Sequence, residues 1–215
     1  MTNLLNCLRK NIDNKSVNLF ISGGNSPRNF LIGLSKKKTL LKKIEIFLTD
    51  ERLIIGNKDY SNYQNINSLF KDNKLTKKIN TFTKKSLKNK QHFISYLKNR
   101  KIISIIGIGN DGHFASIFPF SKKNKFLLDK RANPNFFTTE KIGKPYCNRI
   151  TMNLSMILKS KKVYIIINTR RKLKVLKKAI RARDSIKYPI YSLYKNAKKK
   201  LSIFDAKTLK EIKTL

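Results

Sequence analysis

The stretch that decides the fold is "KIISIIGIGNDGHFASIFP", which runs from Lys101 to Pro119. It opens with an apolar run of strand length, and such a run is typical of a strand buried on both faces of a sheet. Glycines and polar residues follow at once, including His113, one of only two histidines in the chain. The stretch therefore predicts a buried parallel strand with functional residues at its carboxyl end, where open parallel sheets bind ligands.

The same alternation of apolar runs and mixed segments continues along the chain. Further strands are predicted over Val17–Ser22, Lys43–Thr49, Cys147–Asn153, Lys161–Asn168 and Lys200–Asp205. Helices are predicted from about Pro27, over Ser61–Phe70 with Ser61 as N-cap, over Ser86–Arg100, and over Thr169–Ala182 with Leu173, Leu176 and Ile180 facing the core.

This order of elements predicts an α/β fold: a mainly parallel, doubly wound, Rossmann-like sheet with helices on both faces. The length of 215 residues fits a single domain over 1–215. Within it, residues 1–16 form a short N-terminal segment. Residues 71–90 are polar and weakly patterned, and are expected to be a surface excursion.

Composition excludes several classes of protein. No apolar run approaches the ~18 residues of a membrane span, and the N-terminal segment lacks the apolar core of a signal peptide. Cys7 and Cys147 lie far apart and match no metal-binding spacing. We therefore expect a cytoplasmic protein with reduced thiols, no membrane partner, no metal and no cofactor.

The formal net charge of +37 raises the alternative of a basic nucleic-acid-binding protein. Lysine far outnumbers arginine, however, and the excess is spread along the whole chain. Arginine is the residue that bidentate readers of phosphates and bases prefer. These features favour a compositional origin for the charge and no specific nucleic-acid partner, although a positive surface would still attract anionic metabolites.

Two of the predicted strands end in chemically distinctive loops. The first is followed by "SGGNSP" (Ser22–Pro27), whose glycines before a helix let backbone N–H groups face an anion, with hydroxyl donors from Ser22 and Ser26. A plain glycine turn is the alternative. The second ends in "TDER" (Thr49–Arg52), whose acids stand out in a basic chain; they bind or polarise a substrate, or form an ion pair at the sheet edge.

The central stretch carries the candidate base. Gly107, Gly109 and Gly112 permit close backbone approach, and Asp111 and His113 can point into one cleft from the same loop. A histidine in this position can take a proton from water near neutral pH.

Other polar residues are weaker candidates. Ser116 lacks the G-x-S-x-G context of a nucleophile elbow, and His92 is assigned to a helix surface. Arg149 and Lys172 are predicted at the same rim as the glycine loop, although each could be one solvated charge among many.

Taken in order, "SGGNSP", "TDERL", "YSNYQNINSLF", "GIGNDGHFASIFP" and "RITMNLSMIL" resemble the motifs of 6-phosphogluconolactonases, which share a superfamily with glucosamine-6-phosphate deaminases. The resemblance runs from about Leu19 to Ile180. The deaminases carry a glutamate just before the proline of the histidine block, where this chain has Phe118. That difference favours the lactonase over the alternative of a sugar-phosphate isomerase or deaminase.

The resemblance implies hydrolysis of an anionic sugar-phosphate lactone, 6-phospho-D-glucono-1,5-lactone, by a monomer or weak homo-oligomer. It implies that His113 is the general base, that Asp111 orients it and that Arg52 lies near the developing oxyanion. Asp50 matches a catalytic position of the deaminases. Substrate and phosphate binding are implied for Ser22, Gly23, Gly24, Ser26, Asn110, Gly112, Arg149 and Lys172.

The chain departs from the family pattern at three places. The stretch before the first strand is short, which indicates that an N-terminal element is missing. Ile55 replaces a proline after "DER". Thr169 replaces the glycine that often opens the lysine helix, which bears on the placing of Lys172.

Overall fold

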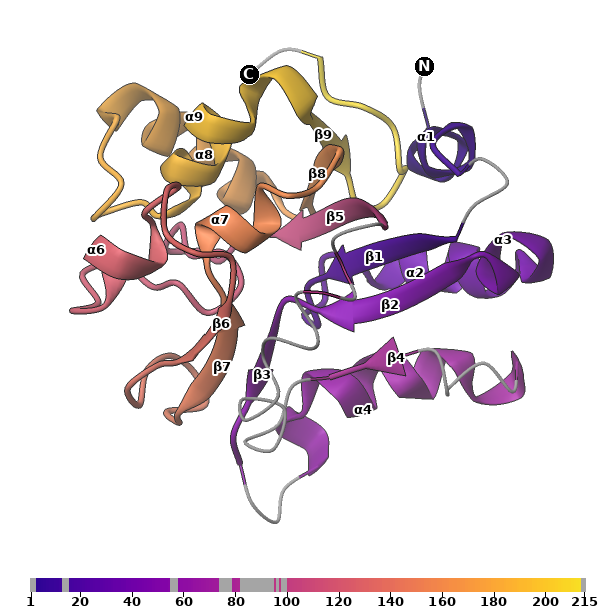
Figure 1. The fold of residues 1–215 in the computed structure, drawn as a ribbon. Helices are drawn as coiled ribbons and strands as arrows, with labels where there is room; N and C mark the ends of the chain where they lie inside the picture. The colour runs from indigo at the N-terminus through magenta and orange to yellow at the C-terminus, as the bar shows by residue number, and fades with distance from the viewer. Residues whose placement is uncertain are drawn as a thin grey trace.

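The computed structural model describes residues 3–12, 16–54, 58–73, 79–81, 95, 97 and 100–213. In these residues, six parallel strands form a central sheet in the order β4-β2-β1-β5-β8-β9 (Figure 1). Their bounds are β1 (Val17–Ile21), β2 (Ile44–Leu48), β4 (Ile79–Asn80), β5 (Lys101–Gly107), β8 (Lys162–Ile167) and β9 (Leu201–Asp205). The predicted α/β fold with a mainly parallel sheet is confirmed.

Side chains along each strand alternate between two hydrophobic cores, because successive residues of a strand point to opposite faces. Phe20 and Ile106 belong to one cluster, whereas Leu19, Ile21 and Ile105 belong to the other. Both faces of the sheet are therefore buried, which explains why the strands are apolar throughout.

Helices cover both faces, as a doubly wound sheet requires. The helices α1 (Leu4–Lys10), α2 (Arg28–Ser35), α3 (Lys38–Lys42) and α4 (Asn62–Asn67) contribute residues to one cluster. The other cluster receives residues from α6 (Asn124–Leu127), α7 (Leu154–Ile157), α8 (Arg170–Ala182) and α9 (Ile190–Ala197).

A second, three-stranded antiparallel sheet lies beside the carboxyl ends of the parallel strands (Figure 1). It consists of β3 (Asp50–Arg52), β7 (Arg149–Met152) and β6 (Phe136–Thr138), in the order β3-β7-β6. Asp50 pairs with Thr151 and Arg52 pairs with Arg149. The strand predicted over Cys147–Asn153 thus exists, but it belongs to this small sheet and not to the parallel one.

The structure differs from the expectations in two other segments. The N-terminal segment was expected to lack a helix or strand, but it forms the helix α1, whose Leu4 and Leu8 are buried. Within 71–90, expected as a surface excursion, Ile79 is buried and pairs with β2 at the sheet edge. Ile55, His92 and most of the helix predicted over Ser86–Arg100 lie outside the described residues.

Short 3₁₀ helices at Lys58–Tyr60, Ser68–Asn73 and Lys198–Lys200 connect some of the elements. Ser61 is the N-cap of α4 as predicted, and its side chain accepts a hydrogen bond from the N–H of Gln64. No helix in the described part of the chain is long and apolar enough to cross a membrane.

Candidate active site

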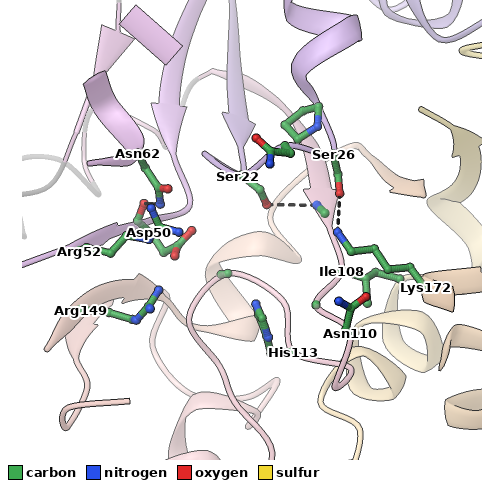
Figure 2. Close-up of a pocket in the computed structure, with 16 residues that line it drawn as sticks. Ser22, Ser26, Asp50, Arg52, Asn62, Ile108, Asn110, His113, Arg149 and Lys172 are labelled. Carbon is green, nitrogen blue, oxygen red and sulfur yellow. Dashed lines mark hydrogen bonds between the residues drawn. The ribbon is translucent and has the colours of Figure 1, made fainter. Parts of the chain in front are cut away.

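A polar cavity of about 270 Å³ lies at the carboxyl ends of β1, β2 and β5 and against the small sheet. In the view of Figure 2, Asp50, Arg52, Asn62 and Arg149 lie on one side and Ser26 and Lys172 on the other, with His113 between them. The lining residues are Ser22, Gly24, Asn25, Ser26, Pro27, Asp50, Arg52, Asn62, Gly107, Ile108, Gly109, Asn110, His113, Ala115, Arg149 and Lys172.

The loop between β1 and α2 forms one wall of the cavity. Ser22 and Ser26 are both buried, and the Oγ of Ser22 accepts a hydrogen bond of 3.1 Å from the N–H of Gly107. Gly23 does not line the cavity: a Cβ added there would lie 2.2 Å from the Cβ of Asn62. Residue 23 must therefore be small because α4 packs against the loop.

Lys172 reaches this loop from the first turn of α8. Its Nζ donates a 3.0 Å hydrogen bond to the Oγ of Ser26, and burial lowers the pKa of the ammonium group. The helix begins at Arg170 with Thr169 as N-cap, whose side chain accepts from the backbone N–H of Lys172 at 3.2 Å. Threonine is a better N-cap than most residues, so its presence fixes the start of the helix and with it the position of Lys172.

His113 and Asp111 form a hydrogen-bonded pair, with 2.6 Å between Nδ1 and Oδ1. Partial burial alone would raise the pKa of Asp111, but its hydrogen bonds with His113 and the charge of that residue lower the pKa overall. An ionised carboxylate only accepts hydrogen bonds, so Nδ1 of His113 is the atom that donates to Asp111. Asp111 itself does not line the cavity, whereas His113 does.

Asp50 lies at the start of β3, is buried, and accepts hydrogen bonds through both carboxylate oxygens. Its Oδ2 accepts from the Oγ of Ser116 at 2.6 Å, and its Oδ1 accepts from the Oγ of Thr49 at 3.3 Å. The backbone N–H of Ser116 also donates a hydrogen bond of 3.1 Å to the Oγ1 of Thr151. Ser116 thus ties the histidine loop to the small sheet, and it is not among the residues that line the cavity.

The two acids of "TDER" have different tasks. Whereas Asp50 lines the cavity, the carboxylate of Glu51 accepts hydrogen bonds of 2.8 Å from the N–H groups of Asn62 and Tyr63. Glu51 therefore caps the N-terminus of α4, where a negative charge meets the positive end of the helix dipole.

Two arginines from paired strands reach the cavity. The Nη1 of Arg52 donates to the carbonyl of Tyr60 at 2.7 Å. The Nε and Nη2 of Arg149 donate to the carbonyls of Ile142 and Pro145 at 3.1 and 3.0 Å. Desolvation lowers the pKa of Arg149, and the charge of Asp50 opposes that shift.

The cavity brings together nine of the twelve site residues that the sequence suggested: Ser22, Gly24, Ser26, Asp50, Arg52, Asn110, His113, Arg149 and Lys172. Gly112 lies outside it, with a φ of +89° that favours glycine, and packs against Tyr188.

Asn62 is a lining residue that the sequence reasoning missed. Its Nδ2 donates to the carbonyl of Asp50 at 2.9 Å. Two signals point to it: its place directly after the predicted N-cap Ser61, and its position inside the motif "YSNYQNINSLF".

Comparison with known proteins identifies the family. Residues 1–203 match the family described as glucosamine-6-phosphate isomerases/6-phosphogluconolactonase. The chain belongs to this family. The resemblance drawn from the sequence motifs is thereby confirmed.

Individual family members agree over most of their length. A 6-phosphogluconolactonase of Helicobacter pylori is 27% identical over 196 residues, which cover 89% of this chain and 84% of that protein. A putative 6-phosphogluconolactonase of Caenorhabditis elegans is 31% identical, over 82% of this chain and 69% of that protein. The crystal structure of a 6-phosphogluconolactonase from Shewanella baltica has the same fold, with a TM-score of 0.74 at 23% identity, covering 94% and 91% of the two chains.

Proposed function

We propose that this family member is a 6-phosphogluconolactonase, which hydrolyses 6-phospho-D-glucono-1,5-lactone to 6-phospho-D-gluconate in the oxidative pentose phosphate pathway. The relatives described above carry that name. The observation that carries the proposal is that His113, hydrogen-bonded to Asp111, lines one cavity together with the serine-glycine loop and Lys172, which is hydrogen-bonded to Ser26.

The loop at 22–26 and Lys172 hold the phosphate. Ser22 and Ser26 offer hydroxyl donors, and Gly24 leaves open space, because a Cβ added there would meet nothing within 4 Å. Asn110 lines the cavity on the same side as Lys172, and Arg149 supplies a second cation from β7 on the opposite side of His113 (Figure 2). A phosphate placed here supplies binding energy remote from the reacting carbon, which fixes the lactone carbonyl relative to the base.

His113 then acts as the general base. Its Nε2 takes a proton from a water molecule while the water oxygen forms a bond to the lactone carbonyl carbon. The imidazolium that results is stabilised by the carboxylate of Asp111 at 2.6 Å from Nδ1. This arrangement orients the ring and stabilises the charged form without a second proton transfer.

The tetrahedral intermediate bears its negative charge on the former carbonyl oxygen, and Arg52 is the cation we assign to it. Asp50 lies beside Arg52 on β3 and balances the charge of the two arginines. When the intermediate collapses, the bond between C1 and the ring oxygen breaks. The ring oxygen takes the proton from Nε2, which restores the neutral base and releases the open-chain acid.

The alternative function, a sugar-phosphate isomerase or deaminase of the same family, would need a proton-transferring side chain at the position of Phe118. That side chain is a buried phenyl ring stacked on His113, with 4.3 Å between ring centroids. A hydrocarbon ring cannot move protons, and this favours hydrolysis.

A coupled assay tests the proposal. Purified protein should accelerate conversion of freshly prepared 6-phosphogluconolactone to 6-phosphogluconate above the spontaneous rate. We expect His113→Ala to lower kcat by about 10²- to 10⁴-fold, the usual contribution of a general base. His92→Gln changes the other histidine and serves as the matched control, with an unchanged rate. An unchanged kcat in His113→Ala would remove this residue from the base role.

A further inference from the structure

Phe118 contacts two side chains of the active site at once. Its ring stacks on the imidazole of His113, with 4.3 Å between centroids and 29° between planes. The Cζ of Arg149 lies 5.2 Å from the centroid of the same ring. Phe118 is 7% exposed, yet it belongs to neither hydrophobic cluster that the described residues form. Its ring is thus buried against side chains of the site.

The stacking completes the fixation of the imidazole. The hydrogen bond between Nδ1 of His113 and Oδ1 of Asp111 fixes one point of the ring. The covalent bond to Cβ and this one hydrogen bond still leave the ring a limited rotation about the Cβ–Cγ bond. A phenyl face packed against the imidazole removes that rotation and so fixes the direction of Nε2.

The turn around Gly143 packs closely against the side chains of Phe118 and Arg149. Gly143 has a φ of +77°, and a Cβ added to it would lie 2.6 Å from the Cζ of Phe118 and 2.9 Å from the Nη2 of Arg149. The carbonyls of Ile142 and Pro145 on either side of it accept hydrogen bonds from Arg149. The turn thus lies against the Cζ edge of the phenyl ring and against the guanidinium group.

We propose that Phe118 is a positioning residue that sets the plane of the His113 imidazole and, with the turn at Gly143, the place of the Arg149 guanidinium. The proposal rests on the proposed lactonase function for its kinetic consequence. The stacking itself is independent of the reaction.

Proton NMR tests the positioning directly. The chain has only two histidines, so His113→Gln assigns the His113 ring resonances by their disappearance. In the wild type, the ring current of Phe118 should move these resonances upfield. Phe118→Leu should return them to the position of an unstacked histidine. Phe120→Leu is the matched control, since Phe120 lies in the same segment but is 69% exposed and should leave the resonances in place.

Kinetics test the consequence for the reaction. Phe118→Leu should lower kcat by about 10- to 100-fold, the scale of a small misplacement of a catalytic group, with a smaller change in KM. Gly143→Ala should displace both Phe118 and Arg149, and should therefore raise KM for the phosphorylated lactone as well as lower kcat. Circular dichroism and thermal unfolding identify any variant that is not folded, and Gly143→Ala provides the second route if Phe118→Leu is among them.

The outcomes separate the two proposals. If the wild type hydrolyses the lactone but Phe118→Leu matches Phe120→Leu in its resonances and its kcat, the positioning role is wrong. If the wild type has no lactonase activity, the proposed function fails. The His113 resonances then still decide whether Phe118 sets the imidazole.

Discussion

Gly109 is a single residue whose lack of a side chain makes room for the His113–Asp111 pair. A Cβ added to it would lie 2.1 Å from Nδ1 of His113 and 2.5 Å from Oδ1 of Asp111. Real Cβ atoms do not approach other atoms so closely. The hydrogen-bonded pair can therefore fold back over the loop only because residue 109 has no side chain.

Lys172 gives a pH-dependent prediction at the same scale. Burial lowers the pKa of its ammonium group from the usual 10.5, so the charge is present below the lowered pKa and is lost as pH rises through it. Binding of 6-phosphogluconate should therefore weaken on the alkaline side before an ordinary lysine would titrate. Calorimetric titration between neutral and alkaline pH measures this loss.

Lys172→Arg is the control for that prediction, because arginine keeps its charge throughout this range. Its affinity for 6-phosphogluconate, though altered by the different shape of the group, should not show the same alkaline loss. An identical pH profile in both proteins would mean that Lys172 does not titrate in contact with the phosphate.

Much of the residue-level site could be predicted because its members follow strand ends in recognisable motifs. His113, Lys172 and Ser26 are of this kind. The contacts of Asn62 and Gly143 could not be predicted, because each is defined by a partner distant in the chain. Asn62 packs against Gly23, and Gly143 lies against Phe118 and Arg149.

The N-terminus of helix α8 gives a prediction about the stability of a secondary-structure element. Thr169 caps the helix through its side chain, where many relatives are expected to have glycine. Thr169→Ala should lower the free energy of unfolding by about 1 kcal/mol, whereas Thr169→Gly should cost only a few tenths of a kcal/mol. Urea denaturation measures both values. Equal effects of the two substitutions would contradict the capping role.

The small sheet is the element that sequence patterns could not place. Its strands are short, and β3 pairs with β7 across roughly a hundred residues of intervening chain. The sequence of β7 has the apolar character of a strand but gives no indication of direction or neighbour. The antiparallel pairing is nevertheless what brings Asp50, Arg52 and Arg149 to one side of the cavity.

The charge of +37 acts on the whole molecule. Like charges on the surface repel one another and attract anionic substrates, and salt screens both effects over about 10 Å at 0.1 M ionic strength. Raising the salt concentration at fixed pH should therefore raise the melting temperature. It should also lower kcat/KM for the phosphorylated lactone more than for unphosphorylated gluconolactone.

Stopped-flow assays and thermal melts over a potassium chloride series make both measurements. A kcat/KM for the phosphorylated lactone that does not respond to salt would show that the charge does not steer the substrate. Nucleic-acid affinity that survives physiological salt would instead favour the alternative that the charge serves a specific polyanion.

The fold as a whole was the most predictable level. Apolar strands alternating with amphipathic helices indicate a doubly wound parallel sheet, because only burial on both faces allows such strands. The edge strand β4 escaped prediction because it is only two residues long, Ile79–Asn80, and stands in a polar segment.

The central claim is that one cavity holds a phosphate at the Ser26–Lys172 end and presents the reacting carbon to His113. A crystal structure with bound 6-phosphogluconate tests it most directly. We predict the phosphate within hydrogen-bonding distance of Ser26 and Lys172, and the carboxylate that derives from the lactone carbonyl beside Nε2 of His113. A phosphate bound elsewhere, or a carboxylate on the far side of the molecule from the imidazole, would contradict the account.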